Sequence, residues 1–162
     1  MKDKTKRVMI DGTQYQIKRF APDVGSFILG RILNSINKVL IETMKAFGDA
    51  VRDVQPAPAT SPAAAPTQEQ TEERIRRMAT DAFGVMSFEE RSVVQQKCLQ
   101  VCARVETHSE ETLMPLANAN GCLVDDLQLI LRLELETLVF NFYDFFAEGG
   151  LNALLKSPAP RT

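Results

Sequence analysis

Hydrophobic positions are densest between Leu127 and Phe146, where thirteen of the twenty residues are Leu, Ile, Val, Phe or Tyr. Alternating leucines in the first half fit a strand, but one apolar set recurs every three or four residues, as on one face of a helix. Leu and Glu favour helix, and Gly149–Gly150 follow the window as a left-handed stop. We therefore predict a helix capped by Asp125, with an apolar stripe of Leu127, Leu131, Leu135, Leu138, Phe142 and Phe145.

Charges and a second apolar row decide where this helix lies. Four charged residues within twenty are too many for a membrane span: Arg132, Glu134, Glu136 and Asp144. The second row, formed by Leu129, Leu133 and Phe140, leaves little of the circumference polar. Such a helix runs through the middle of a bundle or offers its spare face to another chain. The second row should therefore lie beneath the N-terminal hairpin or be exposed to a partner.

The N-terminal pattern predicts that hairpin. Two apolar runs, Val8–Ile10 and Tyr15–Ile17, flank Asp11-Gly12, a dipeptide that readily adopts the positive φ angles of a tight turn. An isolated hairpin is barely stable in water, so its apolar side chains need the helices or another sheet edge. The unpaired edge of the hairpin is a candidate contact with a partner or with a second copy of the chain. A homo-oligomer is therefore one of the possible assemblies.

A long helix should run from Pro22 to about Phe47. Proline fits the first turn of a helix, and Asp23 is placed favourably against the positive end of the helix dipole. Gly25 and Gly30 lie at spacings that let another backbone approach closely. They serve either tight packing within the fold or a notch for a partner. The predicted stripe of this helix is Leu29, Ile32, Leu33, Ile36, Leu40, Met44 and Phe47.

Residues 55–70 hold half of the prolines of the chain and predict a flexible Pro/Ala-rich linker. Residues 1–54 and 71–156 should complete one core on either side of it, and residues 157–162 should form a free tail. An amphipathic helix is predicted from Thr71 to about Gly84. Ser87 and Glu90 then form a capping box, which opens a further helix through Val94, Cys98, Val101, Cys102 and Val105.

No helical period follows between residues 107 and 123. Leu113, Met114 and Leu116 surround Pro115 and predict an extended plug that tucks apolar side chains under the helices. The stretch Asn118–Gly121 is typical of a turn leading into the last helix. The predicted fold class is mainly α: a small helical bundle with an N-terminal β-hairpin and a disordered Pro/Ala-rich insert.

The formal net charge of −2 conceals a polarity along the chain. Residues 1–20 carry six cations and two acids, a balance of +4, whereas residues 106–148 carry nine acids and one arginine, a balance of −8. Scattered cations without interleaved aromatics are typical of a solvated surface, and the acidic half argues against nucleic-acid binding. A basic segment of a partner would suit that half. With neither a signal peptide nor a membrane anchor in the pattern, we expect the protein in the cytoplasm.

The sequence offers no catalytic, cofactor or metal site. Three cysteines in a chain without an export signal read as reduced thiols, and the spacing of Cys98 and Cys102 is not that of a zinc knuckle. His108 adjoins Ser109 and Glu110, but adjacent residues cannot form a catalytic triad. Phosphate-binding loops and HExxH are missing from the sequence as well. We therefore expect a binding protein and no enzyme.

The hairpin stretch KRVMIDGTQYQIKRF, the APDVG turn at Ala21–Gly25 and the closing LETLVFNFYDFF at Leu135–Phe146 carry a resemblance that covers both ends of the chain. Together they resemble the tail assembly chaperones of long-tailed bacteriophages, in which an Asn followed by aromatics, here Asn141, closes the sequence. The Pro/Ala insert looks like a family-variable region.

This resemblance implies that the chain binds the tape measure protein in the host cytoplasm. It would keep this long helical client soluble while tail tube subunits polymerise around it, with the tail tube protein as a further candidate partner. It also implies absence from the finished virion and a second, longer product made by a ribosomal slip, for which Leu155-Lys156 allows suitable codons. The alternatives are a virion structural protein, such as a head–tail connector or tail completion subunit, and a small DNA-binding regulator using the basic N-terminus.

Overall fold

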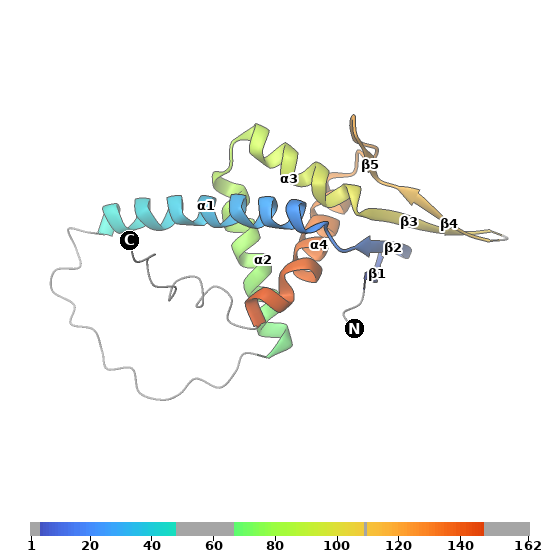
Figure 1. Cartoon of the computed structure of the whole chain (residues 1–162), viewed down its shortest axis with the longest axis horizontal. Coiled ribbons are helices and arrows are strands. Elements are labelled where there is room, and N and C mark those ends of the chain that lie inside the picture. Colours follow the sequence, from blue (N-terminus) through green and yellow to red (C-terminus); the bar gives the residue numbers. More distant parts are fainter. Residues whose placement is uncertain (1–3, 48–66, 109, 148–162) are drawn as a thin grey trace.

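The computed structural model describes residues 4–47, 67–108 and 110–147, and for residues 39–47 the backbone alone. The helices in these ranges are α1 (Pro22–Phe47), α2 (Gln68–Val85), α3 (Phe88–Gln100) and α4 (Leu127–Ala147). The strands are β1 (Thr5–Ile10), β2 (Thr13–Lys18), β3 (Cys102–Thr107), β4 (Glu111–Pro115), β5 (Ala117–Asn118) and β6 (Gly121–Cys122). In Figure 1 the strands gather at one end of the molecule, and α1 runs away from them across α2.

The predicted hairpin is confirmed. β1 pairs with β2 in antiparallel register, with Val8 opposite Tyr15 and Ile10 opposite Thr13. The two turn residues, Asp11 and Gly12, have φ angles of 48° and 78°. Positive φ at both central positions gives a turn whose twist matches that of the strands, which is why an Asp-Gly pair selects this register.

The predicted helix through Val101, Cys102 and Val105 is wrong beyond Gln100. Helix α3 ends there, and β3 pairs antiparallel with β2, placing Tyr15 opposite Arg104 and Ile17 opposite Cys102. The hairpin exposes an unpaired edge, and the β-branched residues in this segment pack well on a pleated surface. Pairing with a strand from far away in the sequence therefore outweighs the local helical spacing.

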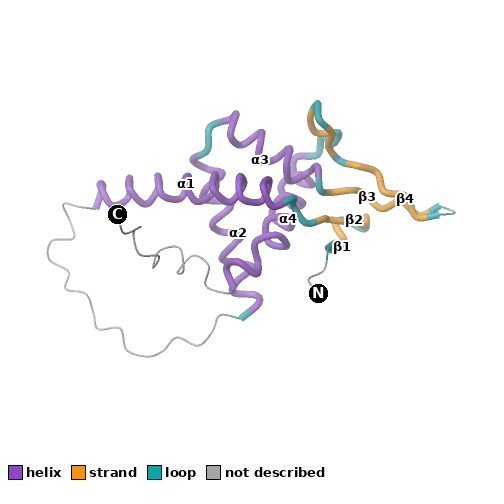
Figure 2. The backbone as a smooth tube through the Cα atoms, in the orientation of Figure 1, coloured by secondary structure: helices purple, strands orange, loops and turns teal. Residues whose placement is uncertain are grey.

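The fold is consequently not a plain helical bundle. Strand β4 adds to β3, so the hairpin becomes half of a four-stranded antiparallel sheet in the order β1-β2-β3-β4. A second pair, β5 and β6, encloses the predicted turn at Asn118–Gly121. Figure 2 shows the long β3–β4 arm extending from the helical part. Of the predicted plug, only Leu116 is buried, whereas Leu113 and Met114 lie on β4 with 37% and 42% of their surface exposed.

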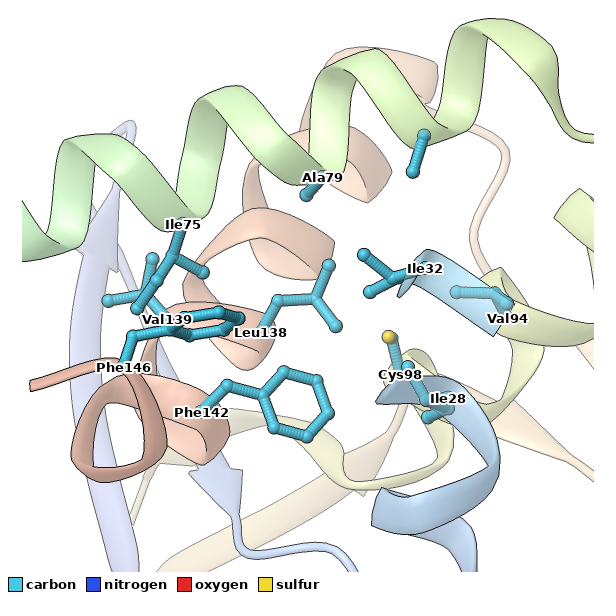
Figure 3. Close-up of a cluster of buried hydrophobic side chains, with 11 residues drawn as sticks. Ile28, Ile32, Ile75, Ala79, Val94, Cys98, Leu138, Val139, Phe142 and Phe146 are labelled. Atoms are coloured by element: carbon cyan, nitrogen blue, oxygen red, sulfur yellow. The ribbon is translucent and has the colours of Figure 1, made fainter. Parts of the chain in front are cut away.

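Two clusters of buried side chains hold these elements together. The helical core combines residues of all four helices, as Figure 3 shows: Ile28, Ile32, Ile75, Ala79, Ala82, Val94, Cys98, Leu138, Val139, Phe142 and Phe146. The sheet core lies between the sheet and the first half of α4: Ile10, Tyr15, Ile17, Leu99, Cys102, Leu116, Ala117, Ile130 and Leu133. Helix α4 therefore belongs to both cores.

Capping residues fix where three helices begin. The capping box predicted at Ser87 and Glu90 is confirmed. A second one, formed by Thr67 and Gln70, starts α2 at Gln68, three residues before the predicted start. At α4 the cap is Asp126 and not Asp125, because its Oδ1 accepts hydrogen bonds from the amides of Gln128 and Leu129. The predicted linker lies outside the described residues up to residue 66, and so does the predicted free tail.

Candidate partner-binding surface

The predicted apolar stripe of α4 is buried only in its second half. Leu138 and Phe142 lie in the helical core, whereas Leu127 and Leu131 have exposed fractions of 65% and 38%. Helix α2 packs on the second half of α4, and the first half instead turns Ile130, Leu133, Glu134 and Thr137 inward. The chain thus leaves leucines uncovered on its most apolar helix.

We name Leu127, Leu131 and Leu135 the leucine face. Their spacing of four residues stacks them on one side of α4, about 6 Å apart along the helix axis. Leu135, which is half-buried, also lines a groove between α4, α2 and the edge strand β1. The other residues that line the groove are Val8, Met9, Ile10, Arg76, Arg132 and Glu136. Val8, Ile10 and Leu135 form the apolar part of this groove, whereas Met9, between Val8 and Ile10 on the strand, points to the opposite face of the sheet and is 64% exposed.

Ion pairs frame the groove. Glu136 receives hydrogen bonds from Lys6 Nζ at 2.9 Å and Arg76 Nη2 at 2.7 Å. Burial raises the pKa of Glu136, but these two hydrogen bonds and the two positive charges outweigh burial, so the pKa is lowered overall. On the outer side, Arg132 Nη1 lies 3.0 Å from Asp11 Oδ1 and ties the hairpin turn to α4. The groove walls are therefore held in fixed positions.

The same contacts explain the polarity of charge along the chain. Lys6 pairs with Glu136, Arg7 with Glu111, and Arg19 with Asp144, so the basic N-terminus lies against the acidic half. Arg19 also stacks on the Phe140 ring, 4.1 Å from its centroid. The sequence suggested a basic partner segment for the acidic half, and a large part of that role is filled by the chain's own hairpin.

Beneath the surface, Arg91 of α3 and Glu134 of α4 form a two-pronged ion pair. Glu134 is completely buried, and the Arg91 guanidinium also lies 3.8 Å from the centroid of the Phe83 ring. Burial raises the pKa of Glu134, and the hydrogen bonds and charge of Arg91 oppose this shift without cancelling it. This pair joins the inward-facing side of α4 to α3.

A family model described as phage tail assembly chaperone protein, TAC, matches residues 11–153. The chain belongs to this family. The match spans all four helices and five of the six strands, and it begins at the hairpin turn. Searches of curated proteins and of solved structures found no match.

The chaperone places the residues predicted to bind a partner in two different settings. Leu133 is fully buried in the sheet core, and Leu129 and Phe140 pack half-buried against that core, next to the hairpin. Leu133 therefore offers no surface to a partner. For Leu129 and Phe140 a partner contact stays a prediction.

The two predicted notch glycines of the chaperone have room around them. A Cβ on Gly25 would meet only Phe20, at 3.6 Å, and a Cβ on Gly30 would meet nothing within 4 Å. Neither glycine is therefore required for close packing among the described residues. Gly25 lines a second shallow groove, between the start of α1 and the end of α4, together with Phe20, Leu29, Phe142 and Phe145. A partner notch there stays a prediction.

The leucine face is the feature that sequence reasoning missed. Its residues belong to the stripe assigned to the core, because the pattern alone does not reveal which part of α4 the other helices cover. The cysteines also lie differently: Cys98 is in α3, but Cys102 begins β3 and donates to the Cys98 carbonyl at 3.2 Å. Among the described residues, no group of three or more His, Cys, Asp or Glu is arranged to hold a metal, and no helix is long and apolar enough to cross a membrane.

Proposed function

We propose that this tail assembly chaperone binds the tape measure protein in the host cytoplasm and keeps it soluble while tail tube subunits polymerise around it. The observation that carries the proposal is the family match over residues 11–153. The proposed role is binding without a chemical step, with no cofactor and no metal. The tail tube protein is a second candidate partner, and the chaperone would be absent from the finished virion.

The exposed apolar surface supports a binding role. A tape measure protein is a very long helical chain, and its apolar faces associate with one another when nothing covers them. The leucine face and the adjoining groove offer a complementary apolar strip on a helix that both cores hold in place. Amphipathic helices bind such strips through apolar residues spaced by three or four. Covering the client in this way would keep its helices from aggregating.

The DNA-binding alternative loses support from the ion pairs. Affinity for nucleic acid comes largely from cations that neutralise phosphates. Lys6, Arg7 and Arg19 each lie against an acidic side chain of the same chain, so phosphates would have to compete with these carboxylates.

Co-expression with the tape measure protein of the same phage tests the proposal. The tape measure protein should move from the insoluble to the soluble fraction when the chaperone is present, and it should co-purify with an affinity-tagged chaperone. An unrelated helical protein that carries the same affinity tag serves as the control. Unchanged solubility together with no co-purification would contradict the proposal. Stoichiometric chaperone in purified virions would favour the structural-protein alternative.

A further inference from the structure

We propose that two copies of the chain associate through strand β4, which would join their sheets into one antiparallel sheet around a two-fold axis at Leu113. This inference goes beyond the proposed function, because it concerns the chain alone and requires no client. Three observations carry it: the backbone groups on the outer edge of β4, the absence of charge from the middle of this strand, and an order of residues that suits pairing of the strand with itself.

The outer edge of β4 has backbone groups that point away from its own sheet. β4 is an edge strand in the order β1-β2-β3-β4, and it lies on the arm that extends from the helical part in Figure 2. Directly after β4, the Leu116 amide donates to the Cys102 carbonyl at 3.3 Å, so these two residues form a hydrogen-bonded pair. Such pairs alternate along an antiparallel ladder. Every second residue of β4 therefore bonds to β3, and the N–H and C=O groups of Glu111 and Leu113 point outward.

The two edges of the sheet differ in charge at their centres. In β1 the outward backbone groups belong to Thr5, Arg7 and Met9, because Ile10 bonds to β2 beside the turn. Two copies that paired about the middle of β1 would set Arg7 against Arg7, and like charges directly opposite each other are destabilising. The middle of the β4 edge is Leu113, which is uncharged and exposed. β4 is therefore the edge that suits a second copy.

The order of residues in β4 suits pairing of the strand with itself. In an antiparallel pair centred on Leu113, the two copies of Leu113 exchange their N–H and C=O groups. Glu111 of each copy donates its N–H to the Pro115 carbonyl of the other copy, so the N–H that proline lacks is missing only at the end of the strand. Thr112 lies opposite Met114 of the other copy. No charged side chain then faces a like charge directly across the interface.

One face of the sheet adds an apolar contact. Val105 of β3 is buried and lies opposite Leu113, and residues that lie directly opposite each other share one face of a sheet. The two-fold pairing would extend this apolar pair by the same two residues of the second copy. Strands of this length bury less than the roughly 1,600 Å² of a standard interface, so we expect a weak dimer with a Kd in the micromolar range.

Analytical ultracentrifugation of the full chain tests the dimer. Between about 5 and 200 µM the unmodified chain should shift from monomer to dimer. Leu113→Pro removes the outward N–H at the axis and leaves the bonds to β3 in place, and edge strands accept proline where the N–H faces away from the sheet. Because two hydrogen bonds of the interface are lost, this variant should associate at least about tenfold more weakly.

The matched control is Thr5→Pro, which removes an outward N–H from the opposite edge strand, β1. This control should associate like the unmodified chain. A second variant, Leu113→Lys, keeps the N–H but sets two like charges against each other, so it should also weaken association, and added salt should restore part of it. Circular dichroism shows whether each variant is folded. If Leu113→Pro does not fold, Leu113→Lys decides the outcome.

Several results would overturn the proposal. An unmodified chain that stays monomeric at about 200 µM would do so, because a Kd in the micromolar range predicts mostly dimer at that concentration. A folded Leu113→Pro variant that dimerises like the unmodified chain would also do so. Loss of the dimer in Thr5→Pro would place the contact on β1 and not on β4. Assemblies larger than a dimer would indicate pairing of β4 with β1 of the next copy and would rule out the two-fold arrangement.

The test of the dimer is separate from the test of the proposed function. Self-association is measured without the tape measure protein, so a monomeric chain would leave the proposed function standing. Failed capture of the tape measure protein would in turn leave the dimer standing.

Discussion

Both carboxylate oxygens of Glu134 accept hydrogen bonds from the guanidinium of Arg91, and this guanidinium also stacks on the ring of Phe83. Helices α2, α3 and α4 therefore meet at one charged pair. A charge buried this completely is costly unless its partner stays in place. The pair therefore ties the buried side of α4 to α3 and, through Phe83, to α2.

Removing one member of the pair should destabilise the fold strongly. We expect Arg91→Met to lower the free energy of unfolding by about 3 kcal/mol, because it leaves a buried carboxylate unpaired. The double variant Arg91→Met/Glu134→Leu should recover most of that loss. Urea unfolding followed by circular dichroism measures both. Arg31→Met, which breaks an exposed pair with Glu90, is the control and should change stability by less than about 1 kcal/mol.

The Arg91→Met variant should also gain stability relative to the unmodified chain as the pH falls from 7 toward 5. The pKa of Glu134 is already raised in the folded state, and loss of Arg91 removes the interactions that oppose the shift. A carboxyl group with a raised folded pKa contributes stability below its unfolded pKa and loses that contribution as the pH rises through the folded value. Unfolding curves across this range measure the effect, and a stability difference independent of pH would contradict it.

The contribution of Glu136 to stability should depend on pH in the opposite direction. Its pKa is lowered from the ordinary 4.5, so its ionised form stabilises the fold above that value and the contribution disappears as the pH falls through the folded pKa. Glu136→Gln should cost about 1 kcal/mol at pH 7 and flatten the acid side of the stability profile. A profile as steep as that of the unmodified chain would show that other carboxylates dominate acid unfolding.

Two glycines should respond to alanine in opposite directions. Gly12 has a φ of 78° in the hairpin turn, so Gly12→Ala should cost about 1 kcal/mol. Gly84 lies within α2, where an added Cβ would meet nothing within 4 Å, and Gly84→Ala should stabilise by about 0.5–1 kcal/mol. Thermal unfolding of the two variants provides the comparison. A stabilising Gly12→Ala would contradict the turn geometry.

The thiols should differ in reactivity. Cys98 and Cys102 are buried, and burial raises the pKa of the Cys98 thiol well above its usual value and that of Cys102 to about 11. Cys122 is exposed. Titration of the native protein with a thiol reagent at pH 8 should therefore modify Cys122 first, and the other two should react only on unfolding. Equal rates for all three would show that both the helical core and the sheet core open readily.

The sequence predicted those elements whose signals are local. An Asp-Gly pair between short apolar runs places the hairpin, and a serine three residues before a glutamate places the start of α3. The start of α1 at Pro22 follows from the proline itself. These signals concern residues only a few positions apart, so no knowledge of the fold was needed to interpret them.

The predictions that failed depend on distant partners. Cys102 and Val105 have the spacing of a helix face, and only the open edge at Tyr15–Ile17, far away in the chain, makes them a strand. In the same way, Leu127 and Leu138 have equivalent places in the apolar pattern. One is exposed and the other buried because α2 covers one half of α4 and not the other. Such coverage is a property of the assembled fold.

The two cores share a helix that comes last among the described elements. Neither the helical core nor the sheet core is complete without side chains from α4, at residues 130–146. During synthesis the chain emerges from the ribosome N-terminus first. The hairpin and the first three helices therefore emerge while both cores still lack the side chains of α4. The native packing can therefore form only after α4 has left the ribosome, and the onset of chaperone activity must wait for that point.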